Sequence, residues 1–538
     1  MFQTTDSLKT DLYELTMAAG YFQNRYNPRA TFELFCHQLP ENRNYLITCG
    51  LSEVIAYIFN LRFDRGDIQY IRSLPAFRRV QPAFYDFLRS FHFTGDIWAV
   101  PEGEVVFANE PIIQVDAPII EAQMIETFLL AIMHIETLVA TKAARIVQAA
   151  KSDGITRGVV DFGSRRAHGP DAAVHAARAA YIAGCMGTSN MYAGRKYDIP
   201  VYGTIAHSWV EAYPSEEVSF NAYHQIFPEH TTLLIDTYDT LSITKKLSQF
   251  YFRHKIKAVR IDSGDLAVMS KHVRKILDDD GLSHVKIIAS GNLNEHKIAE
   301  LIKSKAPIDL FGVGTEMVTS KDEPALDLTY KLVQINDPAM GLQFKAKRSQ
   351  GKHTIPGKKQ LYRKYSKSGK IEKDVLMLYH DHTKDKMRSL LQPVVIGGRL
   401  HKPMPTLDQI RTRVQQSLHS LPDDFLHLKK KKRFEIELGG RVKAASQKME
   451  DQHAQVIKMP SKVVQDKKGP VKKKGAAKPA LKTTAKKTSG KTMKKAAKKS
   501  TVKKPMLKKG IKKAAPVTKK KAGKKTAVKK NIKRKGKK

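Results

Sequence analysis

Cysteine is scarce in this chain of 538 residues, and its three copies lie far apart. Cys36, Cys49 and Cys185 form no CxxC pair and are odd in number, which argues against a disulfide framework and against a zinc knuckle. A reducing, cytoplasmic setting is the simplest expectation.

Long apolar runs free of charge are also missing. The first ten residues, MFQTTDSLKT, have neither a basic region nor an apolar core, so no signal peptide is predicted. The longest apolar stretch, residues 128–150, contains His134, Glu136, Lys142 and Arg145 and is typical of a buried amphipathic helix. We therefore expect no membrane span.

The C-terminal segment lacks aromatic residues and has almost no acids. Residues 461–538 contain 33 Lys and Arg against the single acid Asp466, so they carry about +32 of the formal net charge of +42. Such a segment is predicted to be a disordered basic tail, and its composition resembles linker-histone-like tails. It favours non-specific, salt-dependent nucleic-acid binding; a solubilising tail, a tether to acidic membranes and a reading-frame extension are the alternatives.

The remaining 460 residues contain 61 basic and 51 acidic residues, as in an ordinary folded protein. In their centre, apolar runs alternate with helix-length segments, which predicts parallel strands joined by crossover helices. We expect an α/β fold: an irregular (β/α) barrel, or alternatively an open doubly wound sheet, plus an α+β domain built from N-terminal and C-terminal segments.

The expected boundaries are 1–127 and 341–440 for the α+β domain, 128–340 for the barrel, and 441–538 for a linker and the tail. The predicted central strands are 158–162, 199–204, 232–237, 257–262, 284–290 and 308–314, and the helices between them are 170–184, 241–252, 265–279 and 293–304.

Three of these strands end in polar loops of small residues: VRIDSGD (259–265), IIASGN (287–292) and LFGVGT (310–315). Glycine and serine at the carboxyl end of a strand let the backbone approach an anion closely, and the N–H groups that open the next helix can donate to it. Three such loops in succession predict a phosphate site.

Arg260 and Asp262 lie two residues apart in one strand and therefore share a face. Arginine offers a bidentate fork to a carboxylate or phosphate, and an aspartate at a strand end can hold a sugar hydroxyl or bound Mg²⁺. A structural ion pair is the alternative interpretation.

Two further strand ends carry candidate functional groups. DFGSRRAHGPD (161–171) places two adjacent arginines before a helix, which suits a diphosphate, although one of Arg165 and Arg166 is expected to be a solvated surface residue. VYGTIAHS (201–208) places His207 where it could act as a nucleophile or proton carrier, or else as a structural histidine.

Together with TDLYELTMAAGYF (10–22), FELF (32–35) and HTIPGKKQLYR (353–363), these motifs resemble the nicotinate phosphoribosyltransferase family over about residues 8–365. The resemblance implies a type II phosphoribosyltransferase fold and a homodimer with active sites at the subunit interface. It implies ligase-type formation of nicotinate mononucleotide and diphosphate from nicotinate and phosphoribosyl diphosphate, with ATP as co-substrate, in NAD biosynthesis. Mg²⁺ is the implied cofactor, with no direct protein ligand expected.

The resemblance also implies roles for individual residues. Tyr13 resembles the aromatic residue that stacks on the pyridine ring, and Thr204 and Arg260 resemble the nicotinate contacts. His207 resembles the histidine that ATP phosphorylates, and Asp262 resembles an acid that contacts the ribose. Asp265 would add negative potential near the ribose ring. The expected phosphoribosyl diphosphate ligands are Arg165, Ser290, Gly291, Gly312, Gly314 and Thr315.

The nearest alternative is a nicotinamide-specific phosphoribosyltransferase, which shares the DFG-x-R and RxDSG motifs. The small Ala206 before His207, and the N-terminal TDLYELTM, resemble the nicotinate enzymes instead. A protein that acts through its basic tail on nucleic acid is the alternative from another functional class.

Overall fold

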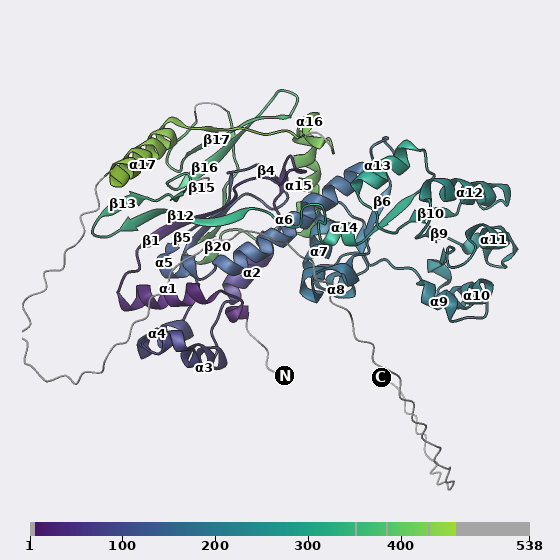
Figure 1. Ribbon diagram of the computed structural model, residues 1–538, viewed down its shortest axis with the longest axis horizontal. Helices are drawn as coiled ribbons and strands as arrows, with labels where there is room; N and C mark the ends of the chain where they lie inside the picture. Colours follow the sequence, from purple (N-terminus) through teal and green to yellow (C-terminus); the bar gives the residue numbers. More distant parts are fainter. Residues whose placement is uncertain (1–5, 350–351, 384–385, 429–430, 459–538) are drawn as a thin grey trace, which may run out of the picture. The chain divides into compact units, whose positions relative to one another are not determined.

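The computed structural model describes residues 6–349, 352–383, 386–428 and 431–458 (Figure 1). The basic segment 461–538 lies outside the described residues, so its predicted disorder and nucleic-acid binding stay predictions. The described part has a mixed α/β architecture with one parallel sheet and several antiparallel or mixed ones. This confirms the fold class expected from the sequence.

The largest sheet has seven strands and is antiparallel. It joins distant parts of the chain, since β1 pairs with β12 and β3 pairs with β19. In spatial order its strands are β13 (Gly341–Phe344), β12 (Leu328–Asp337), β1 (Arg29–Cys36), β5 (Pro111–Pro118), β3 (Asp96–Ala99), β19 (Gln392–Ile396) and β20 (Arg399–Leu400).

The second sheet has six strands, all parallel. Its spatial order is β7 (Gly187–Thr188), β6 (Gly158–Asp161), β11 (Leu310–Val313), β10 (Lys286–Ala289), β9 (Ala258–Ile261) and β8 (Thr232–Leu234). The helices that follow its strands are α7 (Pro170–Ile182), α8 (Met191–Tyr197), α11 (Thr240–Lys246), α12 (Leu266–Asp279), α13 (Glu295–Lys303) and α14 (Thr315–Val318).

Five of the six predicted central strands are present, and the prediction for 199–204 is wrong. That segment makes only one bridge, Val201 to Thr188, on the outer side of β7. Thr188 N donates to Pro200 O and Tyr202 N donates to Thr188 O. Proline has no N–H to extend such a ladder, and the strand that takes this place in the sheet is β7, which was not predicted.

The other elements cover the sheets or join them. The remaining helices are α1 (Leu12–Gln23), α2 (Leu51–Asn60), α3 (Arg65–Ser73), α4 (Pro82–Arg89), α5 (Ile119–Gln123), α9 (His207–Glu211), α10 (Glu216–Ile226), α15 (Leu407–Ser420), α16 (Asp423–Leu426) and α17 (Gly440–Lys458). The remaining strands are β2 (Leu46–Ile47), β4 (Val105–Val106), β14 (Arg348–Ser349), β15 (Lys352–His353), β16 (Lys359–Tyr365), β17 (Ile371–Leu378), β18 (Arg388–Ser389) and β21 (Ile436–Leu438).

Helix α6 (Glu126–Ala149) runs between the two large sheets (Figure 1). Leu129 and Met133 in its first half belong to the core beside the antiparallel sheet, and Ala143 and Ile146 in its second half belong to the core beside the parallel sheet. By length and composition the stretch Ile119–Ala149 would suffice to cross a membrane, but 61% of its most apolar window is buried inside the protein, as in a core helix.

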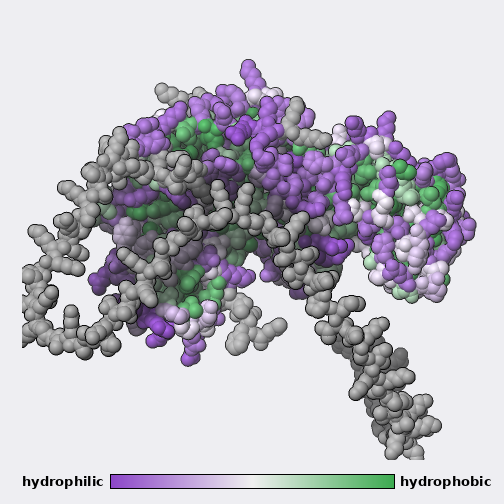
Figure 2. Space-filling view, viewed as in Figure 1, coloured by the Kyte–Doolittle hydropathy of each residue, from purple (hydrophilic) through white to green (hydrophobic). Residues whose placement is uncertain are grey.

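The face shown in Figure 2 is mainly hydrophilic over the described residues, with smaller hydrophobic areas between. Most apolar side chains of α6 are buried, and three of its charged residues, Glu136, Lys142 and Arg145, are buried with them. Each of these three side chains has an oppositely charged partner on another element.

Candidate active site

The carboxyl ends of five parallel strands meet at one edge of the sheet. Strand register places Leu234 beside Arg260, Ile261 beside Ala289, and Val313 beside Asp161. The loops continue this pairing, since Ser290 N donates to Ile261 O at 2.9 Å and Phe162 N donates to Val313 O at 2.8 Å. The polar loops that follow β6, β8, β9, β10 and β11 therefore lie side by side, as parallel strands require.

Arg260 stands at the centre of this edge. Its Nε donates to Ser290 Oγ at 2.7 Å, Nη1 donates to Thr204 Oγ1 at 2.8 Å, and Nη2 pairs with Asp262 Oδ1. Its guanidinium also lies over the Phe162 ring, 5.7 Å from the ring centre. Of the five N–H donors of arginine, three have acceptors among the described residues, which leaves one on each terminal nitrogen.

Asp262 is held as a carboxylate. Burial opposes its ionisation, but the hydrogen bond from Ser290 and the hydrogen bond and charge of Arg260 outweigh that effect and lower the pKa of Asp262. Its backbone N–H donates to Asp236 Oδ2 at 2.9 Å, and Ser263 Oγ donates to the same oxygen at 2.6 Å. The loop after β9 is thus fixed to the loop after β8.

His207 opens α9, three residues after Thr204, which accepts a hydrogen bond from Arg260. Its Nδ1 lies 3.2 Å from Thr237 Oγ1. No other protein partner of the ring occurs among the described residues, so Nε2 faces away from Thr237 without one.

Glycine is required at two of the predicted positions. Gly291 has φ +94°, and a Cβ there would lie 1.9 Å from the carbonyl oxygen of Asp262. A Cβ on Gly312 would lie 2.5 Å from the Phe162 ring. Gly314 precedes Thr315, the first residue of α14, and a Cβ on it would be 3.3 Å from Phe162 O. The loops after β9, β10, β11 and β6 are therefore packed backbone against backbone or ring.

The structure brings Thr204, His207, Arg260, Asp262 and Ser290 together. Arg165 and Asp265 lie in the segments that follow β6 and β9 at the same sheet edge. Arg165 is exposed in the short helix Ser164–Arg166 after β6, beside an open hollow that Asn190 and Tyr192 also line. Asp265 is exposed and caps α12, accepting from Ala267 N and Val268 N at 3.0 and 3.1 Å.

Tyr13 lies on α1, which Figure 1 shows at the opposite side of the molecule from β9 and α9. Burial and the neighbouring Glu126, which accepts its hydroxyl hydrogen bond, raise the pKa of Tyr13. Within one chain, Tyr13 is therefore separate from the Arg260 cluster.

Comparison with known proteins assigns the family. The N-terminal domain model of nicotinate phosphoribosyltransferase matches residues 8–134, the family model matches 158–374, and the C-terminal domain model matches 381–444. The chain belongs to the nicotinate phosphoribosyltransferase family. It is 44% identical over 434 residues to a nicotinate phosphoribosyltransferase (PncB2) of Mycobacterium tuberculosis, covering 79% of this chain and 90% of the relative.

Other relatives agree. A nicotinate phosphoribosyltransferase of Bacillus subtilis is 37% identical over 461 residues, covering 80% of this chain and 92% of its own. The crystal structure of human nicotinic acid phosphoribosyltransferase superposes with a TM-score of 0.71 at 25% identity, covering 82% of this chain and 99% of that one. A nicotinate-nucleotide pyrophosphorylase from Pyrococcus furiosus shares the fold, with a TM-score of 0.62 at 23% identity over 78% of this chain and 97% of its own.

Two residues of this family member's site were missed by sequence reasoning. Asp236 and Thr237 follow β8 and bind the loop after β9 and His207, respectively. The signal was present, because the predicted strand 232–237 ends in Asp-Thr at the same sheet edge as the other loops. This loop lacks the glycine that marks the other strand ends.

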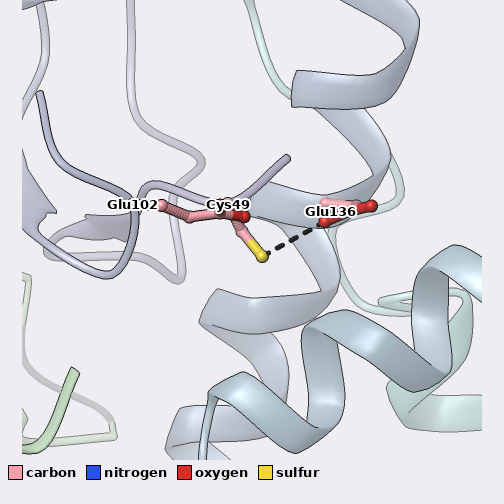
Figure 3. Close-up of side chains that lie close together, drawn as sticks. All are labelled: Cys49, Glu102 and Glu136. Atoms are coloured by element: carbon pink, nitrogen blue, oxygen red, sulfur yellow. Dashed lines mark hydrogen bonds between the residues drawn. The ribbon is translucent and has the colours of Figure 1, made fainter. Parts of the chain in front are cut away.

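One group of three possible metal ligands occurs among the described residues: Cys49, Glu102 and Glu136 (Figure 3). Arg178 from α7 already supplies a positive charge there, donating from Nη1 to Glu102 Oε1 at 2.6 Å and also to Glu136. Burial, Glu136 and Glu102 raise the pKa of the Cys49 thiol well above its usual range. A buried guanidinium and a protonated thiol do not suit a metal, and the cluster is an ion-pair network.

Replacing Gly291 tests the close packing of the loops. Gly291→Ala is expected to lose about 1–3 kcal/mol of unfolding free energy, because φ is positive and the new Cβ would meet the Asp262 carbonyl. Catalytic turnover should fall about 10-fold or more as the loop after β9 shifts. Urea unfolding and steady-state kinetics measure both. Gly281→Ala is the matched control, with φ +73° and nothing within 4 Å of its Cβ; equal effects of the two would refute the packing argument.

The Arg178 network predicts a pH dependence of stability. Burial opposes ionisation of Glu102, but the charge and hydrogen bonds of Arg178, with those of Gly50 and Ser52, lower the pKa of Glu102 to about 2. Because the folded pKa is below the unfolded one, this stabilisation is complete above the ordinary carboxyl pKa and is lost as the pH falls towards 2.

Arg178→Met should therefore lose about 3–5 kcal/mol of unfolding free energy near neutral pH, because two buried carboxylates lose their partner. The difference from the unsubstituted protein should narrow as the pH falls from about 5 towards about 2. Urea unfolding across this range measures it, and a difference that stays constant with pH would contradict the assignment.

Proposed function

We propose that this chain transfers the phosphoribosyl group of phosphoribosyl diphosphate to nicotinate, forming nicotinate mononucleotide and diphosphate for NAD biosynthesis. The family assignment and the names of the relatives support this reaction. The structural observation that carries it is the Arg260 side chain, with one N–H left on each terminal nitrogen at the edge where the phosphate loops meet.

One N–H donor on each terminal nitrogen of a guanidinium can bind the two oxygens of a carboxylate. Ser290, Thr204 and Asp262 hold the guanidinium in place, so little side-chain freedom is lost when the base binds. In this arrangement the carboxylate of nicotinate binds Arg260 and its ring nitrogen is directed towards the ribose. The amide of nicotinamide carries an NH₂ group in place of one oxygen and would meet an N–H donor there.

The ring nitrogen of nicotinate is itself the nucleophile, so no protein base is required. As the C1′–oxygen bond to diphosphate breaks, positive charge develops on the ribose. Asp262 is ionised and adjacent to Arg260, so it can contact the ribose and stabilise that charge. Asp265, exposed at the start of α12, adds negative potential near the same loop.

The glycine loops are assigned to the phosphates. Ser290, Gly291, Gly312, Gly314 and Thr315 would hold the 5′-phosphate through backbone N–H groups, and Arg165 would bind the diphosphate from the loop after β6. Mg²⁺ fits this site, because Asp236 Oδ1 is buried and has no hydrogen-bond partner among the described residues. A hard, hydrated cation suits such an oxygen, with waters between. When bound, Mg²⁺ would neutralise charge on the leaving diphosphate.

ATP coupling is assigned to His207. Thr237 orients its Nδ1, which leaves Nε2 as the atom that would accept the γ-phosphoryl group while ADP departs. Later hydrolysis of the phosphohistidine would release phosphate and draw the equilibrium towards product. Thr237, which contacts His207, directly follows Asp236, whose carboxylate accepts from the backbone N–H of Asp262, and this connects the histidine to the ribose side of the site.

The separation of Tyr13 from the Arg260 cluster supports a homodimer with shared active sites. Leu12, Tyr13 and Met17 are 53%, 42% and 37% exposed on α1, so Tyr13 is available to stack on the pyridine ring of a base bound by a second copy. We further propose that the enzyme is cytoplasmic and that its basic segment 461–538 binds nucleic acid.

The test is formation of nicotinate mononucleotide with and without ATP. We expect ATP to increase turnover or lower the KM values in the unsubstituted enzyme, and His207→Ala to abolish this response while retaining slow ATP-independent transfer. His254→Ala, an exposed histidine before the amino end of β9, is the control and should keep the full response. ATP-independent activity that His207→Ala leaves unchanged would remove the coupling claim, and absence of product under all conditions would refute the proposed reaction.

A further inference from the structure

The ammonium of Lys142 is buried in α6 between two carboxylates from two different elements. Its side chain is 1% exposed, and Nζ lies 2.6 Å from Glu295 Oε2 and 2.8 Å from Asp322 Oδ1. Neither acid belongs to the site described above, and each follows one of the two glycine loops assigned to the 5′-phosphate. Lys142 therefore contacts one acid from the segment that follows each loop, Glu295 after ASGN and Asp322 after GVGT.

Glu295 connects Lys142 to the ASGN loop. It is the first residue of α13, four positions after Gly291, and is fully buried. The start of this helix is tied to the loop, since Asn294 Oδ1 accepts from His296 N and Lys297 N, and Lys297 Nζ donates to Asn292 O at 3.0 Å. Movement of Glu295 would thus be transmitted to the loop backbone.

Asp322 connects Lys142 to the GVGT loop. It follows α14, whose first turn is closed by hydrogen bonds from Met317 N and Val318 N to Gly314 O. Arg43 holds the same acid from the N-terminal part of the chain, with Nη1 2.9 Å from Asp322 Oδ2, and donates from Nη2 to Ser320 Oγ at 3.0 Å. The segment between Gly314 and Asp322 is therefore short and fixed at both ends.

The carboxylates of this network are ionised. Burial opposes this, but Lys142 and Arg145 lower the pKa of Glu295, and Arg43 and Lys142 lower the pKa of Asp322. Arg145 Nε adds a second contact to Glu295 Oε1 at 3.1 Å. Among these charges, Lys142 alone contacts both acids within the described residues, so it fixes their separation.

We propose that Lys142 is a positioning residue that sets the spacing between the ASGN and GVGT loops and thereby the affinity for the 5′-phosphate of phosphoribosyl diphosphate. This inference rests on the proposed function for the phosphate role of the loops. A phosphate bound by backbone N–H groups from two loops requires their separation to be fixed before binding, because small displacements weaken several hydrogen bonds at once.

Steady-state kinetics of the full-length chain test the proposal. Lys142→Met should raise the KM for phosphoribosyl diphosphate about 10-fold or more, while kcat and the KM for nicotinate change less than about threefold. In this variant Glu295 keeps Arg145 and Asp322 keeps Arg43 as charged partners, so neither acid is left unpaired and the variant is expected to fold.

Lys359→Met is the matched control. Lys359 is also 1% exposed and pairs with a buried acid, Glu33, at 2.7 Å, but it lies in β16, away from the parallel sheet. It should lose comparable stability without a selective rise in the KM for phosphoribosyl diphosphate. A KM that Lys142→Met leaves within about twofold, or that Lys359→Met raises equally, would overturn the proposal.

Hydrogen exchange separates failure of this inference from failure of the proposed reaction. Peptides covering 289–292 and 312–315 should exchange faster in Lys142→Met than in Lys359→Met, whatever substrate the enzyme uses. Equal exchange in the two variants would overturn the positioning role even if nicotinate mononucleotide forms. Absence of nicotinate mononucleotide from the unsubstituted enzyme would instead refute the proposed reaction.

Discussion

The structure depends on a helix that carries three charges through the protein interior. Glu136, Lys142 and Arg145 of α6 are each almost fully buried, and an uncompensated charge there would cost several kcal/mol, about 3–5 for a broken buried pair. Glu136 binds Arg178 on α7, and Lys142 and Arg145 bind Glu295 on α13. These partners lie on α7 and α13, which follow the loops after β6 and β10, so the ion pairs also fix those loops.

In the candidate site, too, a partly buried charge is held by partners from several loops. Arg260 would be costly in a half-buried position without acceptors, and Thr204, Ser290 and Asp262 supply three of them. Close backbone contact at Gly291 holds the loop after β10 against that after β9. A rigid cation with two N–H groups left over is a direct consequence of how these loops pack.

Much of this could be predicted from the sequence, because periodicity and strand-end glycines are local signals. The strands at 258–261, 286–289 and 310–313 and the pairing of Arg260 with Asp262 follow from alternation and from the shared sheet edge. Residues 199–204 were not predictable in this way, since their pairing depends on Thr188 in a two-residue strand. The partners of Lys142 lie 153 and 180 positions along the chain from it, and no local pattern links them. The separation of Tyr13 from the Arg260 cluster also depends on tertiary structure, and no local sequence pattern indicates it.

Recognition of a carboxylate by Arg260 is the central claim, and the selectivity between nicotinate and nicotinamide tests it most directly. The measurement is the ratio of kcat/KM for the two bases in the unsubstituted enzyme and in Arg260→Gln, because damage common to both bases cancels in the ratio. We predict a preference for nicotinate that falls about 10-fold to 100-fold on substitution, as expected for the loss of a charge-assisted pair. A preference of the unsubstituted enzyme for nicotinamide, or a ratio that Arg260→Gln leaves unchanged, would contradict this account.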